Sequence, residues 1–596
     1  MAFLTLAPEI IIFIIGLHLE DGRLICTDLP FSSDRLGGDV ESCYELAPAE
    51  YPLCLSANAP EDRILSRQSA ACVDYSHKLP RIFQLCHICS RIRTLVMGAP
   101  QLWARQALCW PARADIILQR AGACLLSFIS KQGLCSCIFS DIKSFLHRSI
   151  EIELILPGVY LRADGAHLSM SALIVNEILR ANQLTDLQLR FDVRRGPDGP
   201  SAPRIISIPS LRSARLQNAE FMPVGKALRV LHIAVEPRGP ALSLPHFISA
   251  LRACPNLQEL ALQNAIQGEY KLPWNAGLAS GCPLVLESLK HLTCSGEQNL
   301  ARALLYWISV SPVLDCHVDA EFRLGTTPDP FDRFSSELAA ELCVLLHPTE
   351  VTAMMTYVRA RAAAEDTGSP FVDVVPDLPP APVLPYLALN VIPDTEVKDY
   401  YTAWPRLVTV AAAEDREGAL RSVLAGCDPV YLGPGRMRRT FTMRNSYASF
   451  PNRTAALTRE SFPTYMRPKH LGMAVSLPFT AYIRQADADD DVIYLALSRT
   501  SWVPQDERDW LFILAELPQL RTIEVLAAAH ADCIRGLALY LWRERGNENL
   551  QEIEFQRTGM SSSVVQSLLE EVHALTVTRE TADEEYHLPR IVWSLS

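Results

Sequence analysis

Two cysteines three residues apart are the first residues in this sequence whose types and spacing could support chemistry. Cys86-His87-Ile88-Cys89 is a Cys-x-x-Cys motif, which can form half of a zinc site or a redox pair. A second pair, Cys135 and Cys137, lies nearby in the sequence. Because the first motif falls within a predicted packed helix, buried thiols are the favoured interpretation, and we expect no metal site.

An acidic run and a basic run could bind ions or nucleic acid. Asp487 and residues 489–491 are spaced somewhat like calcium ligands, but a Gly at the sixth position and a Glu at the twelfth are missing, which favours a solvated loop. The basic run could hold nucleic acid or an acidic peptide, although a Gly-Pro hairpin with solvated arginines is favoured. It consists of Gly433, Pro434, Gly435, Arg436, Arg438, Arg439, Phe441 and Arg444.

No motif in the sequence nominates a catalytic nucleophile. A phosphate-binding loop ending in Lys-Ser or Lys-Thr, a His-Glu-x-x-His motif and a Gly-x-Ser-x-Gly motif are all absent. An enzyme whose residues converge only in three dimensions is an alternative, and it would require a deep cleft lined by titratable groups. The expectation is that the protein is not an enzyme and binds no cofactor.

The composition is that of a large globular protein. With 596 residues, of which 49% are apolar and 20% charged, the chain is long enough for about three or four domains or a repeat array. Its net charge of -12 disfavours general binding to a nucleic-acid backbone. Its 17 cysteines, spread along a long chain, indicate a reducing compartment, and no apolar stretch reaches the roughly 18 residues of a membrane span. We therefore expect a cytoplasmic or nuclear protein without nucleic-acid or membrane partners.

The N-terminal segment predicts a helix that needs burial on every side. Pro8 and Glu9 suit the first turn of a helix, and no basic region precedes the apolar run as it would in a signal peptide. Residues 10–15 are apolar all the way round, so Ile12 and Phe13 must contact either the core of this chain or a second protein.

A second apolar helix is predicted further along the chain. Gly98 can close this helix in the left-handed conformation and Pro100 prevents it from restarting, which would place Leu102 and Trp103 on its flank as a fixed apolar anchor. We expect this helix to pack against residues 10–15 and the intervening residues 22–78 to be irregular. The apolar stripe of the second helix consists of Leu85, Cys89, Ile92 and Val96.

Together the two segments resemble the two halves of an F-box, in particular that of fungal, mushroom-type proteins. Leu6-Ala7-Pro8-Glu9 and the apolar run are similar to the first half, with Ala7 where Pro is common, and Ile92 stands where the second half usually has Trp. Residues 16–78 separate the halves, and residues 116–127 resemble the segment that follows the F-box in many such proteins. The second half is matched by Ile88, Cys89, Arg91, Arg93, Leu95, Val96, Pro100, Leu102 and Trp103.

The resemblance implies that the N-terminal helices dock on a Skp-family adaptor and, through it, on a cullin. Buried aliphatic and aromatic side chains would dominate such an interface. The residues implied in this contact are Leu6, Pro8, Ile10, Ile11, Ile14, Ile15, Leu85, Ile88, Cys89, Leu95, Pro100, Leu102 and Trp103.

A recurring cassette, Leu-x-x-Leu-x-Leu, predicts short strands with one apolar face. Its middle residues Leu495, Ile523 and Ile553 are expected on neighbouring parallel strands at equal depth. The repetition resembles irregular leucine-rich repeats, although a generic α/β domain would give some of the same matches. The cassettes begin at Leu184, Leu228, Leu257, Val492, Leu520 and Leu550, and less cleanly at Leu211 and Leu289.

These patterns predict an α/β protein with a short all-α F-box-like N-terminus followed by a leucine-rich-repeat-like solenoid. The expected segments are an F-box-like domain at 1–110 with an insertion at about 20–79, a first array at 111–320, a helical and Pro-rich segment at 321–403, and a second array at 404–596. The function implied is substrate recognition for a cullin-type ubiquitin ligase, with an unknown protein substrate held by the repeats. The alternative is a non-catalytic repeat scaffold whose N-terminal helices only cap the array.

Overall fold

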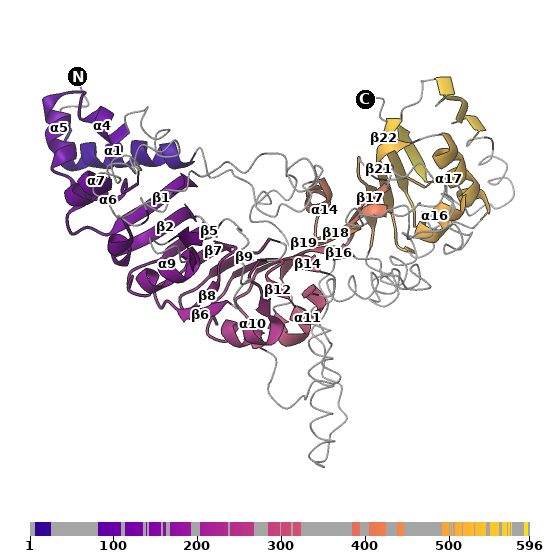
Figure 1. The fold of residues 1–596 in the computed structure, drawn as a ribbon. Helices are drawn as coiled ribbons and strands as arrows, with labels where there is room; N and C mark the ends of the chain where they lie inside the picture. Colours follow the sequence, from indigo (N-terminus) through magenta and orange to yellow (C-terminus); the bar gives the residue numbers. More distant parts are fainter. Residues whose placement is uncertain are drawn as a thin grey trace, which may run out of the picture. The chain divides into compact units, whose positions relative to one another are not determined.

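A computed structural model shows a mixed α/β protein, in which mostly parallel sheets carry helices (Figure 1). The chain divides into two compact units, unit 1 (Met1–Gly268) and unit 2 (Glu269–Ser596). This boundary falls inside the predicted 111–320 array, and the division into four segments stays a prediction. The structure describes residues 6–24, 81–108, 114–134, 139, 142–156, 159–161, 167–191, 203–236, 239–267, 284–297, 300–310, 314–322, 384–393, 405–424, 438–445, 492–499, 501, 503–504, 507–514, 517–529, 531–543, 549–558, 563–564, 566–568, 570–571, 574 and 589–593.

Helices form the N-terminal part of unit 1. Helix α1 contacts α5, and Arg91 donates a hydrogen bond to the backbone oxygen of Leu6, so the predicted packing of the two apolar segments is confirmed. Helix α1 continues four residues past position 20, and the remainder of the predicted insertion, from residue 25, lies outside the described residues. The helices are α1 (Pro8–Leu24), α4 (Arg81–Leu85), α5 (Ser90–Met97), α6 (Pro100–Ala104) and α7 (Ala114–Ala121).

The turn between α5 and α6 differs from the sequence expectation. Gly98 ends α5 with a φ of -87°, so the left-handed conformation is not used. Pro100 does not stop the chain from forming a helix but begins the short helix α6, because the missing N–H of proline costs nothing in a first turn.

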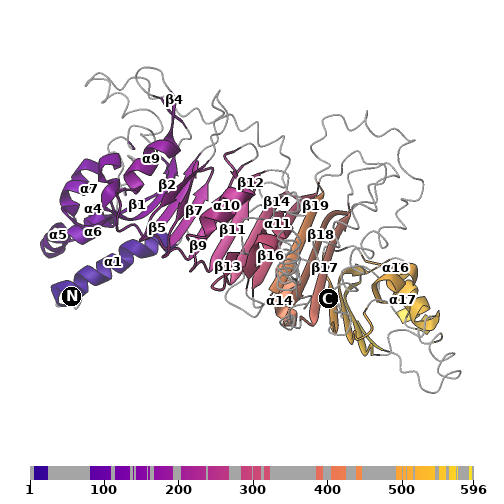
Figure 2. The same ribbon diagram turned by 90° about the horizontal axis from the view of Figure 1, so that it is seen from below.

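The main sheet of unit 1 is parallel throughout. Its strand order is β1-β2-β5-β7-β9-β11, and the middle residues of four cassettes, Leu187, Ala214, Leu231 and Leu260, are buried and in register. Helices α9 (Met170–Ile178) and α10 (Leu244–Leu251) lie along one face of this sheet (Figures 1 and 2). The strands are β1 (Leu126–Gly133), β2 (Ser149–Leu156), β5 (Asp186–Phe191), β7 (Ser213–Gln217), β9 (Val230–Ala234) and β11 (Glu259–Gln263).

An asparagine joins three neighbouring strands of unit 1. Asn218 follows β7 with a φ of 57°, a left-handed conformation that Asn tolerates better than most residues. Its Nδ2 donates to the backbone oxygen of Phe191 at 2.9 Å, at the end of β5. Its Oδ1 accepts from the backbone N–H of Glu236 at 2.8 Å, just past β9. The side chain therefore satisfies backbone groups on both sides of its own strand.

Unit 2 has the strand order β14-β16-β19-β18-β17-β20-β21-β22-β23. Leu495, Ile523 and Ile553 are fully buried and in register on three parallel strands, so the prediction that they lie on neighbouring parallel strands at equal depth is confirmed. The strands are β14 (His291–Glu297), β16 (Asp315–Phe322), β17 (Tyr386–Pro393), β18 (Pro405–Ala413), β19 (Arg438–Asn445), β20 (Tyr494–Leu497), β21 (Thr522–Ala529), β22 (Glu552–Thr558) and β23 (Arg590–Trp593), and the helices are α11 (Leu300–Trp307), α14 (Arg416–Leu424), α16 (Glu507–Leu514) and α17 (Ala531–Arg543).

Three strands in the middle of this order interrupt the parallel pattern. Strand β18 is antiparallel to both β17 and β19, while β17 and β19 are parallel to their other neighbours, β20 and β16. The sequence did not predict β17, which lies in the segment expected to be helical and Pro-rich. Both Leu387 and Ala388 are buried, so this strand lacks the apolar-polar alternation that marks a half-exposed strand. The helices expected from the apolar patterns of that segment lie outside the described residues.

Two arginines of the basic run, Arg438 and Arg439, are not solvated as the sequence predicted. Arg438 and Arg439 begin β19 in the interior of the sheet, and both are buried. Arg438 lies 3.4 Å from the carboxylate of Asp315 on β16. Alternation along β19 sends the two side chains to opposite faces, and both faces are covered here. Residues 433–436 lie outside the described residues.

Replacing Asn218 by Ala should destabilise the chain more than the same change at Asn264. Both residues have a positive φ, 57° and 50°, so both variants share the strain of a left-handed alanine. The Asn264 amide makes no hydrogen bond to the described residues. Asn218→Ala, by contrast, also leaves the Phe191 oxygen and the Glu236 N–H without the hydrogen bonds that Asn218 makes to them. The difference should be about 1–3 kcal/mol in urea unfolding. Equal losses would show that the bridge contributes nothing.

Candidate functional site

Helix α1 has an apolar face on each side. Ile11, Ile15 and Leu19, spaced by four residues, are buried against the rest of unit 1. Four further apolar residues recur at i, i+3, i+4 and i+7 and form a continuous stripe on the opposite side. This α1 outer stripe consists of Ile10, Phe13, Ile14 and Leu17, whose exposed fractions are 48%, 65%, 37% and 46%.

The predicted contact residues divide into surface and core. Pro8, Ile10, Ile14 and Ile88 are exposed, Ile88 in the turn between α4 and α5. Leu17 was not among the contact residues predicted from the sequence, and Phe13 was predicted only to need burial, although the spacing of the apolar residues indicates both. The half-buried members are Leu6, Leu85, Cys89, Leu95 and Pro100, and the buried ones are Ile11, Ile15, Leu102 and Trp103.

Trp103 is part of the core and not the exposed anchor that the sequence suggested. It is fully buried, and its Nε1 donates to the backbone oxygen of Val96 at 2.8 Å. The Phe83 ring meets it edge to face at 5.3 Å, and the Arg120 guanidinium lies 5.6 Å from its centre. Because α6 turns back against α5, the indole points into the helices and holds them together.

The Cys-x-x-Cys motif has structural contacts on both sulfur atoms. Cys86 is buried and its thiol donates to the backbone oxygen of Ile82, and burial raises the pKa of this thiol. Cys89 precedes α5 and its sulfur accepts from the backbone N–H of Ile92 at 3.5 Å, which caps the helix. Within the described ranges, no group of three His, Cys, Asp or Glu residues could hold a metal ion.

The sheet of unit 1 has a polar face on the side away from α9 and α10. Side chains between the buried leucines point there because residues alternate along a strand. His232 on β9 lies 2.7 Å from the carboxylate of Glu259 on β11. This unit 1 strand face consists of Glu151, Glu153, Asp186, Gln188, Arg190, Arg215, Gln217, His232, Glu259 and Gln263.

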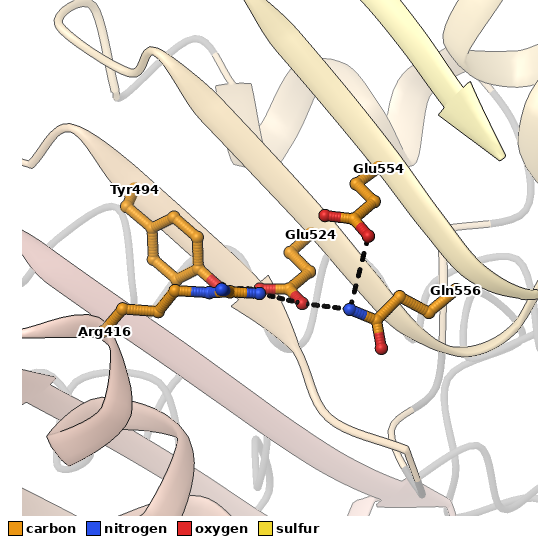
Figure 3. Close-up of polar contacts among 5 residues, drawn as sticks. All are labelled: Arg416, Tyr494, Glu524, Glu554 and Gln556. Atoms are coloured by element: carbon orange, nitrogen blue, oxygen red, sulfur yellow. Dashed lines mark hydrogen bonds and ion pairs between the residues drawn. The ribbon is translucent and has the colours of Figure 1, made fainter. Parts of the chain in front are cut away.

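Unit 2 contains a polar cluster around Glu524 of β21 (Figure 3). The Glu524 side chain is only 1% exposed, yet the Arg416 guanidinium donates to both of its oxygens, at 2.9 and 2.5 Å. The Tyr494 hydroxyl and the Gln556 amide donate to the same carboxylate. Desolvation and the bond to Glu524 raise the pKa of Tyr494, so the phenol keeps its proton. Four donors saturate the carboxylate, which leaves it unsuited to act as a general base.

The sequence around α14 explains how Arg416 reaches Glu524. Asp415 caps the helix by accepting from the N–H of Gly418 at 2.6 Å. Ala419 packs against Ala388, Ala411 and Ala496 of the sheet, and such small side chains allow close approach. This packing places Arg416, in the first turn of α14, within hydrogen-bonding distance of Glu524 on β21. We call this arrangement of Arg416, Glu524, Tyr494 and Gln556 the Glu524 clasp; no local sequence signal marks it, because Arg416 and Glu524 are 108 residues apart.

Comparison with known proteins adds no family to these observations. No family model matches the chain, and no curated protein matches it. None of the described helices has the length and apolarity needed to cross a membrane.

Replacing Arg416 by Gln should destabilise the chain more than replacing Glu524 by Gln. Arg416→Gln leaves an almost fully buried carboxylate without its cation, for which about 3–5 kcal/mol is typical. Glu524→Gln leaves a guanidinium whose side chain is 50% exposed and can turn to water. Urea unfolding gives the order, and hydrogen exchange of α14 should accelerate in both variants.

Glu554→Gln is the matched control for the clasp. Glu554 is half-buried on β22, and its carboxylate accepts from Gln556 at 3.4 Å. This change should leave exchange in α14 unaltered. A loss in Glu524→Gln equal to or larger than that in Arg416→Gln would contradict the clasp.

Proposed function

We propose that this chain is the substrate-recognition subunit of a cullin-type ubiquitin ligase that acts in the cytoplasm or nucleus. Its N-terminal helices would form an F-box-like domain that docks on a Skp-family adaptor. The strand arrays would form an irregular leucine-rich-repeat solenoid that holds a protein substrate. The chain itself would carry out no bond chemistry. The observation that carries the proposal is the α1 outer stripe.

The outer stripe favours a docking role because its residues gain little from the fold itself. Full burial of one large aliphatic or aromatic side chain contributes about 1.5–3 kcal/mol. Phe13 is 65% exposed, so most of that contribution is still available to a partner. Four adjacent side chains of this kind, with Ile88 also exposed, offer the apolar centre that protein interfaces need.

The packing of unit 1 supports the repeat part of the proposal. Four cassettes supply parallel strands in matching register, with helices α9 and α10 along one face. Asn218 links the ends of neighbouring strands through backbone contacts. Repeat proteins stabilise each unit through its neighbours in this way.

The scaffold alternative predicts a different environment for α1. If the N-terminal helices served only as a cap over the array, their apolar residues would be buried against it. Ile12 is half-buried and Phe13 is exposed, which favours a helix that meets a second protein.

Leu17→Asp should weaken capture of a purified Skp-family adaptor by an order of magnitude or more, because it places a charge where apolar surface must be desolvated. Leu179→Asp is the matched control, since both leucines are 46% exposed and both lie in unit 1. A pull-down of the full chain with adaptor, beside a thermal melting curve of each variant, gives the result. Both variants should melt like the wild type.

Core variants separate loss of binding from loss of folding. Ile11→Asp and Trp103→Ala alter fully buried residues, so each should lower the melting temperature as well as adaptor capture. Adaptor capture by Leu17→Asp at the wild-type level, or no capture by the wild type, would refute the ubiquitin-ligase role in favour of the scaffold.

A further inference from the structure

We infer that the unit 1 strand face binds an extended acidic segment of a protein, through Arg190 of β5 and Arg215 of β7. The bound segment belongs to a substrate only if the proposed function holds, and its acidic character gives the chemical class of that substrate. It concerns a different surface from the α1 outer stripe.

The two arginines are neighbours on adjacent parallel strands. Arg215 is in register with Gln188, and Arg190 is in register with Gln217, so the arginines occupy diagonal positions. With about 4.8 Å between strands and about 6.6 Å between residues i and i+2 of a parallel strand, diagonal neighbours lie about 8 Å apart, which places two guanidinium groups within reach of one short segment. Both side chains are exposed.

The side chains directly beside these arginines carry no negative charge. Arg190 stands between Ile155 of β2 and Gln217 of β7. Arg215 stands between Gln188 of β5 and His232 of β9, and that imidazole is hydrogen-bonded to Glu259. Neither guanidinium makes an ion pair with any described residue. Two unpaired like charges side by side are unfavourable in the free protein, and an anionic ligand would relieve this repulsion.

The nearest carboxylates sharpen the choice of ligand. Glu153 and Asp186 lie diagonally from the arginines, and Asp186 accepts a hydrogen bond from Thr185. The Glu236 carboxylate lies 3.3 Å from the amide nitrogen of Gln217, the neighbour of Arg190. With Glu151 beside Asp186, the beginnings of β2 and β5 are acidic. A dense polyanion would be repelled by these groups, whereas two separate carboxylates can each meet a guanidinium in a bidentate contact.

The spacing of the arginines matches an extended segment with acidic residues at alternate positions. Residues i and i+2 of an extended chain point to the same side and are about 6.5–7 Å apart. This separation is close to the diagonal spacing of about 8 Å between Arg190 and Arg215, and the length of the arginine side chains covers the difference. Gln188 lies beside Arg215, and its amide can hydrogen-bond to the backbone of such a segment. The amide nitrogen of Gln217 already donates to Glu236, so Gln217 offers its amide oxygen as an acceptor.

The test measures binding of a fluorescent synthetic peptide of alternating Glu and Thr to the full chain at near-physiological salt. Peptides of alternating Gln and Thr and of alternating Lys and Thr serve as controls. The acidic peptide should bind and both controls should not. The Arg190→Glu, Arg215→Glu double variant should weaken binding of the acidic peptide about tenfold or more.

The variant Arg252→Glu controls for the change in net charge, and it is compared with Arg190→Glu and Arg215→Glu as single variants. Arg252 is exposed at the end of α10 and lies off the strand face, so its reversal should change affinity by less than about twofold. No binding of the acidic peptide to the wild type, or equal binding by the wild type and the double variant, overturns the inference.

Adaptor capture, measured in the same preparations, distinguishes the proposed ubiquitin-ligase role from binding of an acidic segment by the strand face. Leu17→Asp should lose the adaptor and keep the acidic peptide, and the double arginine variant should do the reverse. If the wild type fails to capture the adaptor but binds the acidic peptide through the arginines, the ubiquitin-ligase role fails while the binding face stands.

Discussion

Matching register between parallel strands is the constraint on which both units depend. A single short strand cannot bury three apolar side chains, so Leu187, Ala214, Leu231 and Leu260 are protected only because each neighbour presents an apolar residue at the same depth. A shift by one residue would turn these side chains to the opposite face. The cassettes and the Asn218 bridge both act against such a shift.

This constraint fixes one face of each sheet and leaves the other face to vary. In unit 1 the free face carries polar side chains, including Arg190 and Arg215. In unit 2 helix α14 covers part of the corresponding face. Ala419 of α14 packs tightly against alanines of the sheet, and the polar side chain of Glu524 lies beneath the same helix. Covering Glu524 is tolerable only because four donors replace the water that its carboxylate loses. The two units therefore use the same strand pattern with different outcomes on the second face.

The sequence predicted those features that repeat locally or follow from spacing. The cassettes identified buried strand residues such as Leu187 and Leu260 because alternation is a local property. The sequence did not predict β17 or the burial of Arg438, since a strand covered on both faces has no alternation of apolar and polar residues to detect. The Glu524 clasp was also out of reach, because it joins residues that are distant in the chain.

The N-terminal helices show the same limit in another form. An apolar run on all sides of α1 predicted burial but could not say which residues meet the core of the chain. Packing decides this: Gly16 is buried, and a Cβ there would lie 3.9 Å from Leu102, so α1 approaches α6 closely along the side that carries Ile11 and Ile15.

Burial of the side of α1 that carries Ile11 and Ile15 fixes the rotation of this helix about its axis. Trp103 holds α5 and α6 together through its bond to Val96, and thereby shapes the surface that receives α1. Phe13, two positions from each of Ile11 and Ile15, must then point away from the core, since residues two apart lie on different faces of a helix. The buried indole thus helps to determine which face of α1 stays exposed, and that face carries the outer stripe that we propose as a docking surface.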